Sequence, residues 1–407
     1  MNPGTPVFGP FPNWPHATRI QPESPSNRPA ICIPYPAAGH PRETYRLAFN
    51  CEPQQSNTMN VGNRINDHMN AQHPLDQDTP LALNGLDVDT QDLPDIVDPP
   101  AYVYRSKLSE FLWTLPQPII ALTSMIAVAI AISNNSMTPE ALSGDADALT
   151  ALLLFSPLFL LLAAERIWTK KKAWLLNWRD YAEDAFWLFT AAYIWIPLIS
   201  DYYETPISSA FEWVRENTFI PFTLEAATIP GLILCAVIVQ TTSEFIYYWI
   251  HRCSHRYMIA WRTHATHHHI TKMSAARSNR THPTEFLALS FSTPIILALF
   301  GASTEVIAVS AALGFCNGWI THSNLPMRSG VWNWFFTSPE HHQLHHSHNF
   351  DDSNTNFGCG IIIWDRIFGT FSNSSHIERC GSGTGKQLNL FDQYVLAFYS
   401  NDKLKQL

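Results

Sequence analysis

The sequence predicts an all-α integral membrane protein with four transmembrane helices, an apolar helical hairpin and a histidine-rich cap on the cytoplasmic side. Three observations indicate this fold. Only 14% of the 407 residues are charged, which is well below the roughly 25% usual in soluble domains. Apolar residues gather in separate runs of near-membrane length, and the loops between these runs alternate in charge. The mean hydropathy of −0.07 conceals this pattern, because a long polar segment offsets the apolar one.

Residues 1–105 form that polar segment. They contain 17 of the 29 prolines and no lysine, and no stretch keeps a helical or alternating apolar period. Such a segment buries too little apolar surface to offset its ordering entropy, so we expect a disordered N-terminal tail. It lacks the basic start and apolar run of a signal peptide. A translation start at Met59 or Met69 is the alternative interpretation.

The predicted membrane helices begin after this tail. Each of the first four apolar runs is near the roughly 17–25 residues that cross a bilayer as a helix, although the third is short. The last two runs are separated by Gly301 and are predicted to form a hairpin. The four spans and the two arms of the hairpin are 115–132, 147–164, 185–199, 229–250, 286–300 and 306–320.

Loop charges predict the orientation of these helices. Arg105 and Lys107 precede the first run, and basic residues also dominate the 165–184 loop and the segment after Ile250. The loops after the first and third runs are acidic. Because cytoplasmic loops of membrane proteins carry the excess of Lys and Arg, we expect these three basic segments on the cytoplasmic side.

Histidines are concentrated in the second half of the chain. Thirteen of the 18 lie between residues 251 and 348, and eight of them form one HxxxH group and two HxxHH groups. Residues i and i+4 share a helix face, whereas the middle histidine of HxxHH is turned roughly 100° away toward a neighbouring ion. The spacing therefore predicts two metal ions with four imidazoles each. The eight residues are His251, His255, His264, His267, His268, His342, His345 and His346.

The predicted hairpin returns the third histidine group to the side of the first two. Imidazole binds Fe, Zn, Cu and Ni, so these ligands alone do not select the metal. A basic, histidine-rich loop without metal is the alternative. Glu244 lies on the helical stripe of His251 and His255. Its carboxylate could orient a metal-bound imidazole, or it could be a water-exposed acid. Because ligands must be neutral, we expect activity to fall as the pH drops through about 6.

Several phrases of the sequence resemble the fatty acid hydroxylase/sterol desaturase superfamily of membrane di-iron enzymes. The resemblance covers roughly residues 105–371. Within the superfamily, the sequence is similar to bacterial sterol-desaturase-like proteins and alkylglycerol monooxygenases. The resemblance implies a catalytic domain over 106–371, followed by a C-terminal tail over 372–407. The phrases are EFIYYWIHRCSH (244–255), WRTHATHH (261–268), RTHPTE (280–285), SPEHHQLHHS (338–347) and WDRIFGT (364–370).

The resemblance implies two iron ions that activate O2 to hydroxylate or desaturate a C–H bond of a sterol, fatty acyl or alkylglycerol lipid. The eight histidines carry over as iron ligands. His322 matches a further ligand region and His282 matches the RxHPxE phrase, where some relatives have glutamine. Some relatives have another histidine or glutamine about four residues before His322, but position 318 is glycine here. Electrons would come from a cytochrome b5-like or ferredoxin-like protein, since the chain has no dinucleotide fingerprint.

Two other functions compete with this expectation. A membrane haem or metal-ion carrier would place paired histidines inside facing spans, whereas these histidines follow helix ends and loops. An intramembrane zinc hydrolase would show HExxH, which is absent. The net charge of −9 argues against a nucleic-acid partner. The expected location is an integral membrane, the inner membrane in a bacterium or the endoplasmic reticulum in a eukaryote, with the site facing the cytoplasm.

Overall fold

The computed structural model describes residues 102–134, 136, 148–219, 223–373, 377, 379–382 and 387–404. These residues belong to one unit, His73–Leu407. Within these ranges the regular secondary structure is entirely helical, and the only β pairing consists of two isolated bridges. The all-α prediction is therefore confirmed. The predicted disordered tail falls outside the described residues up to residue 101.

Three of the described helices are long and apolar enough to cross a membrane: Lys107–Ser133, Ile229–Arg256 and Pro283–Phe300. The first joins α1 (Lys107–Leu112) to α2 (Pro116–Ser133), and the second is α7 (Ile229–Arg256). The second predicted span corresponds to α3 (Ala148–Ile167). The described residues thus support membrane-spanning helices, and the count of four spans plus a hairpin stays a prediction.

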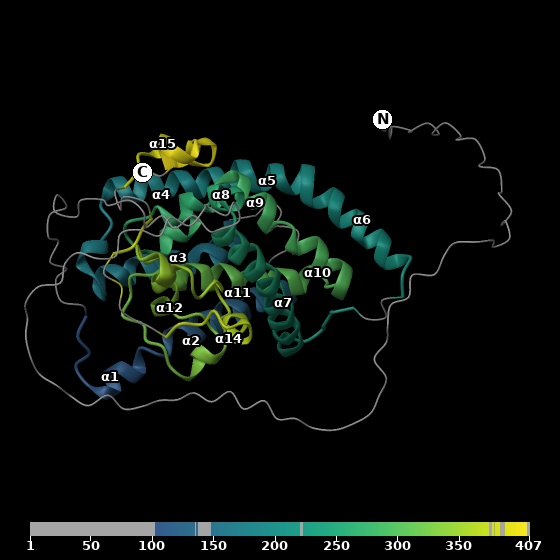
Figure 1. Cartoon of the computed structure of the whole chain (residues 1–407). Helices are drawn as coiled ribbons and strands as arrows, with labels where there is room; N and C mark the ends of the chain where they lie inside the picture. Colours follow the sequence, from purple (N-terminus) through teal and green to yellow (C-terminus); the bar gives the residue numbers. More distant parts are fainter. Residues whose placement is uncertain are drawn as a thin grey trace, which may run out of the picture. The chain divides into compact units, whose positions relative to one another are not determined.

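The third predicted span, 185–199, is part of a longer helical stretch (Figure 1). This stretch changes hydrogen-bond register twice through a π-helical turn, and each turn is followed by a helix with a proline in its first two positions. Proline has no N–H to donate, so it disturbs the regular i to i−4 pattern at both places. The successive elements are α4 (Trp178–Thr190), η5 (Ala191–Trp195), α5 (Ile196–Ile199), η6 (Ser200–Glu204) and α6 (Thr205–Glu216).

The segment predicted as a hairpin contains three helices, α9 (Pro283–Leu289), α10 (Ser292–Phe300) and α11 (Thr304–His322). Gly301 ends α10 with a φ of 51°, a left-handed conformation that glycine adopts without a side-chain clash. Helix α11 packs against both α2 and α7, while α10 packs against α6 and α7. Small buried residues such as Ala129, Ala236 and Ala308 let these helices approach closely, and they form the main apolar cluster.

Short helices and 3-10 turns follow the long helices and surround their ends. The basic 165–184 loop lies against this region, because the Lys170 amide donates to the Asn324 carbonyl (2.9 Å) and the Lys170 ammonium donates to Gln343 Oε1 (2.7 Å). These elements are η4 (Lys172–Trp174), α8 (Met258–His268), η7 (Ala275–Asn279), η8 (Val331–Trp334), α12 (Pro339–His345), α13 (Phe350–Ser353), α14 (Ile363–Phe368), α15 (Leu390–Val395), η9 (Leu396–Phe398) and α16 (Asn401–Leu404).

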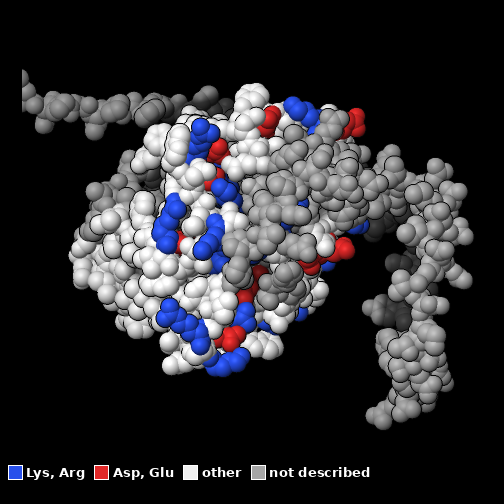
Figure 2. Space-filling model, turned by 90° about the vertical axis from the view of Figure 1, so that its left-hand side faces the viewer, with Lys and Arg blue, Asp and Glu red and all other residues white. Residues whose placement is uncertain are grey.

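Charged side chains gather unevenly on the surface. Figure 2 shows Lys and Arg mixed with Asp and Glu over one part of the visible face, beside a broad uncharged area. Beneath the surface, buried ion pairs join α4 to η7 and the residue that follows it. Arg277 Nη2 lies 2.6 Å from Asp180 Oδ1, and Arg280 Nε lies 2.6 Å from Asp184 Oδ1. These pairs fix the segment that directly follows the second histidine group.

Candidate metal centre

Four helices carry the histidines to one place. His251 and His255 occupy the last turns of α7, and Tyr257 separates that helix from α8, which carries His264, His267 and His268. His322 is the last residue of α11. The third group lies on α12, whose first turn is capped by the Ser338 hydroxyl accepting from the His341 amide. Buried turns at the ends of apolar helices thus position every ligand candidate.

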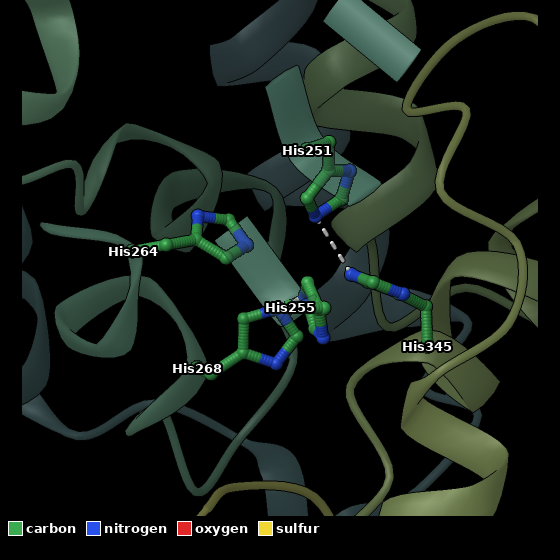
Figure 3. A group of neighbouring side chains, drawn as sticks. All are labelled: His251, His255, His264, His268 and His345. Carbon is green, nitrogen blue, oxygen red and sulfur yellow. Dashed lines mark hydrogen bonds between the residues drawn. The ribbon is translucent and has the colours of Figure 1, made fainter. Parts of the chain in front are cut away.

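The imidazoles form two groups. Within each group the candidate ligand nitrogens all lie within 4.8 Å of one another, and all nine side chains are buried. Figure 3 shows the rings of the first group converging on a common centre from α7, α8 and α12. The five-histidine group is His251, His255, His264, His268 and His345, and the four-histidine group is His267, His322, His342 and His346.

Distances between ring nitrogens fit ligands of a shared ion. The Nε2 atoms of His251 and His345 lie 2.9 Å apart (dashed in Figure 3), and those of His255 and His268 lie 3.2 Å apart. In the four-histidine group, His322 Nε2 lies 3.1 Å from His267 Nε2 and 3.0 Å from His342 Nε2. Two nitrogens about 2.1 Å from one metal ion are separated by roughly 3.0–3.4 Å. His264 Nε2 has no hydrogen-bond partner among the described residues. The donor set therefore fits a dinuclear metal centre.

The two HxxHH groups divide between the two sites as their spacing predicts. His264 and His268 point into the five-histidine group, while His267 points into the other group. In the third group, His342 and His346 share the four-histidine group and His345 crosses to the five-histidine group. The structure differs from the count of four imidazoles per ion. His345 joins the first group, which therefore has five histidines, and His322 joins the second group, which therefore has four.

Hydrogen bonds on the outer ring nitrogens orient the imidazoles. The Nδ1–H groups of His251 and His345 donate to the Phe357 and Thr355 carbonyls (2.6 and 2.8 Å), and that of His322 donates to the Gly318 carbonyl (2.7 Å). A proton held on Nδ1 leaves Nε2 free as a ligand. These contacts therefore fix both the tautomer and the direction of the rings.

Burial also prepares the ligands electrostatically. Desolvation, reinforced by the neighbouring imidazoles, holds the pKa of His267, His268, His342 and His346 well below the usual range. The pKa of His345 is lowered to about 3, mainly by burial. These rings are thus neutral at physiological pH and can bind a metal without first losing a proton.

Two candidates from the sequence lie elsewhere. His282 belongs to neither group, because its Nδ1 accepts from the Thr284 amide (3.2 Å) and its Nε2 donates to the Tyr394 carbonyl (2.9 Å). Glu244 is buried rather than water-exposed, and its Oε1 accepts from the Gly360 amide (3.1 Å). Gln240 and Gly360 donate to Glu244, and no imidazole of the described residues does so, which leaves the orienting alternative without a contact.

Glu285 makes the contact that we expected of Glu244. The His264 Nδ1–H donates to Glu285 Oε1 at 2.7 Å, and both side chains are buried. Asp365 acts one step further away, since it accepts from the Phe357 and Gly358 amides (both 2.7 Å) and so holds the carbonyl that orients His251. Glu285 lies in the motif RTHPTE and Asp365 in the motif WDRIFGT, but the sequence spacing does not predict which residues these acids contact.

In the part of the chain that the structure describes, the fold is all-helical with candidate membrane spans, and the site consists of two buried histidine groups that could hold metal ions. The sequence model of the fatty acid hydroxylase family matches residues 235–370, a range that includes all nine histidines. The resemblance to the fatty acid hydroxylase/sterol desaturase superfamily is thereby confirmed for this part of the chain.

This chain is also similar to several curated proteins, whose names fit the same superfamily. An ornithine lipid hydroxylase from Rhizobium tropici is 35% identical over 145 residues, which cover 35% of this chain and 44% of the relative. An alkylglycerol monooxygenase from Xenopus tropicalis is 30% identical over 37% of this chain and 33% of the relative. A very-long-chain aldehyde decarbonylase from Arabidopsis thaliana is 25% identical over 36% of this chain and 24% of the relative. The chain thus spans less than half the length of these relatives. No solved structure matches it significantly.

Proposed function

We propose that this protein is an O2-dependent di-iron membrane oxidoreductase that hydroxylates or desaturates a C–H bond of a sterol, fatty acyl or alkylglycerol-type lipid. The observation that carries the proposal is the pair of buried histidine groups within the family-matching segment. Relatives named for hydroxylation of an ornithine lipid and oxygenation of alkylglycerols support a lipid substrate. Membrane-length apolar helices beside the site fit a substrate that is held in a bilayer.

The protein's own residues have definite tasks in this proposal. The nine neutral imidazoles would hold two iron ions, which supply the ability to activate O2 for attack on an unactivated C–H bond. Glu285 and the Thr355 and Phe357 carbonyls keep three of the rings in the ligand tautomer. The apolar helices exclude water from the reacting lipid chain. Electrons come from a separate cytochrome b5-like or ferredoxin-like donor on the cytoplasmic side, where the positive loops orient the site.

The test combines metal content, O2 consumption and lipid products. Protein expressed with added iron should contain two iron ions per chain, consume O2 with a reduced donor and yield a hydroxylated or desaturated lipid detectable by mass spectrometry. His267→Ala should lose activity and iron, whereas His348→Ala, an exposed histidine outside both groups, should keep both. Zinc content alone does not discriminate, because Zn²⁺ generally outcompetes Fe²⁺ at nitrogen ligands. An active, iron-loaded His267→Ala protein would contradict the proposal.

A further inference from the structure

Three buried side-chain atoms without a hydrogen-bond partner among the described residues lie on α7 and α11. Asn317 of α11 is 0% exposed, and neither its amide nitrogen nor its carbonyl oxygen has a hydrogen-bond partner among the described residues. Glu244 of α7 is 6% exposed, and its Oε2 is likewise unpartnered. Buried polar atoms in native proteins are almost always hydrogen-bonded, to protein or to ordered water. Three such atoms on facing helices therefore indicate an occupant.

Gly360 defines how close these groups are. A Cβ atom at position 360 would lie 2.7 Å from Glu244 Oε1 and 3.2 Å from Asn317 Nδ2, so the two atoms are at most about 6 Å apart. Asn317 Nδ2 makes no direct hydrogen bond, and a separation of at most about 6 Å lets one water bridge the two side chains. The Gly360 amide, 3.1 Å from Glu244 Oε1, adds a donor at the same place. Because Asn317 is inaccessible from the surface, the occupant must be small, which favours water over a lipid group.

Gly318 leaves open space on the side of α11 that carries His322. Gly318 follows Asn317 and lies one helical turn before His322, so its missing side chain faces the same side of α11 as that ligand candidate. Apart from its own helix, a Cβ at position 318 would meet no heavy atom within 4 Å. The group beyond it has four histidines, one fewer than its neighbour. The four-histidine group, which has fewer candidate ligands than its neighbour, thus has open space on the side of Gly318.

We propose that Glu244, Asn317 and the Gly360 amide bind water, and that Glu244 passes protons through this water, along the open side of Gly318, to the four-histidine site. The inference rests on the proposed function. Hydroxylation of one C–H bond consumes O2, two electrons from the redox donor protein and two protons, and gives the alcohol and one water. Glu244 gives the proton of its carboxyl O–H bond to the bound water, which passes a proton on to the four-histidine site, and the Glu244 carboxylate is then reprotonated by solvent.

The kinetic test uses Glu244→Gln, which keeps an oxygen to accept from Gly360 but cannot carry a proton. We expect kcat to fall about 10-fold or more and the solvent deuterium isotope effect on kcat to rise, with the KM for the lipid and the iron content unchanged. Asn317→Leu should give the same result through loss of the water, and it serves if Glu244→Gln does not fold. Thr242→Val is the control, because Thr242 lies on the same helix and its hydroxyl donates to the Ile238 carbonyl (3.1 Å).

A second test does not depend on turnover. An experimental structure of the protein should show ordered water bonded to Asn317 and Glu244, and Asn317→Leu should remove it. If the protein does not oxidise lipids, the proposed function fails while this density still decides whether the water site exists. Absence of water at Asn317 in that structure would overturn the inference, as would a Glu244→Gln enzyme with wild-type kcat and isotope effect.

Discussion

The imidazole of His264 and the carboxylate of Glu285 form a buried pair, with 2.7 Å between Nδ1 and Oε1. A carboxylate behind a ligand histidine raises its basicity and fixes its orientation, and removal of such a partner typically weakens metal binding 10–100-fold. We therefore expect Glu285→Gln to bind iron about 10-fold more weakly or worse. Competition with a chromogenic chelator measures this change. Glu305→Gln, an acid in the first turn of α11 far from the histidines in sequence, should leave the affinity unchanged.

The buried ion pairs between α4 and residues 277–280 should contribute to the stability of this region. Asp184 Oδ1 lies 2.6 Å from Arg280 Nε, and both side chains are at most 3% exposed. Without Asp184, Arg280 keeps only the more exposed Glu183 at 3.2 Å, and loss of one partner of a buried pair costs up to about 3–5 kcal/mol. Asp184→Ala should therefore lower the free energy of unfolding by that amount in a detergent-solubilised denaturation experiment. Lys107→Ala removes an exposed partner and should have no measurable effect.

The stability of metal-free protein should fall as the pH drops from about 6.5. The folded-state pKa is lowered to about 3 for His345 and to about 4 for His269, both through burial, whereas unfolded histidine titrates near 6.5. Between these values the unfolded chain binds more protons, so unfolding becomes more favourable as the pH falls. Each such histidine contributes a slope of about 1.4 kcal/mol per pH unit.

Melting temperatures of chelator-treated protein at pH 7, 6 and 5 measure this dependence. His345→Gln should flatten the curve, because one of the lowered pKa values is removed. The same burial keeps the rings neutral in the folded protein at pH 6, so we expect metal loss from the folded state at a lower pH than free imidazole would suggest. A melting temperature that is constant from pH 7 to pH 5 would contradict the expectation.

Helical periodicity predicts how each HxxHH group divides, but not that the two groups have five and four histidines. The i, i+4 relation pairs His264 with His268 and His342 with His346, and it turns His267 and His345 toward the opposite sites. The apolar runs likewise indicated a break at Gly301, which takes the left-handed conformation at the end of α10. Local spacing determines these features, so a single sequence is enough to anticipate them.

Contacts between distant segments were not predictable in the same way. Glu285 reaches His264 across 21 positions, and Gly360 reaches Glu244 across 116. Both acids lie near histidines in sequence, and only the packing of α7, α9 and the 357–361 loop decides which one contacts an imidazole. The 185–199 run was likewise predicted from its composition as a separate span. The helical stretch that contains it begins at Trp178 and continues past Pro197 and Pro206 to Glu216. Hydropathy alone does not show where a helix continues.

The division of adjacent histidines between two sites gives the sharpest test of the centre. His345 and His346 are neighbours in sequence, but they belong to different groups, whereas His345 and His251 share one group with 2.9 Å between their Nε2 atoms. Stepwise iron titration of the metal-free protein should show two binding events in the wild type. Combining His345→Ala with His251→Ala should abolish one event and keep the other, because both changes remove ligands from the same ion. Combining His345→Ala with His346→Ala should weaken both events. His282→Ala, outside both groups, should change neither, and equal titration curves for the two double variants would show that the ions are not divided in this way.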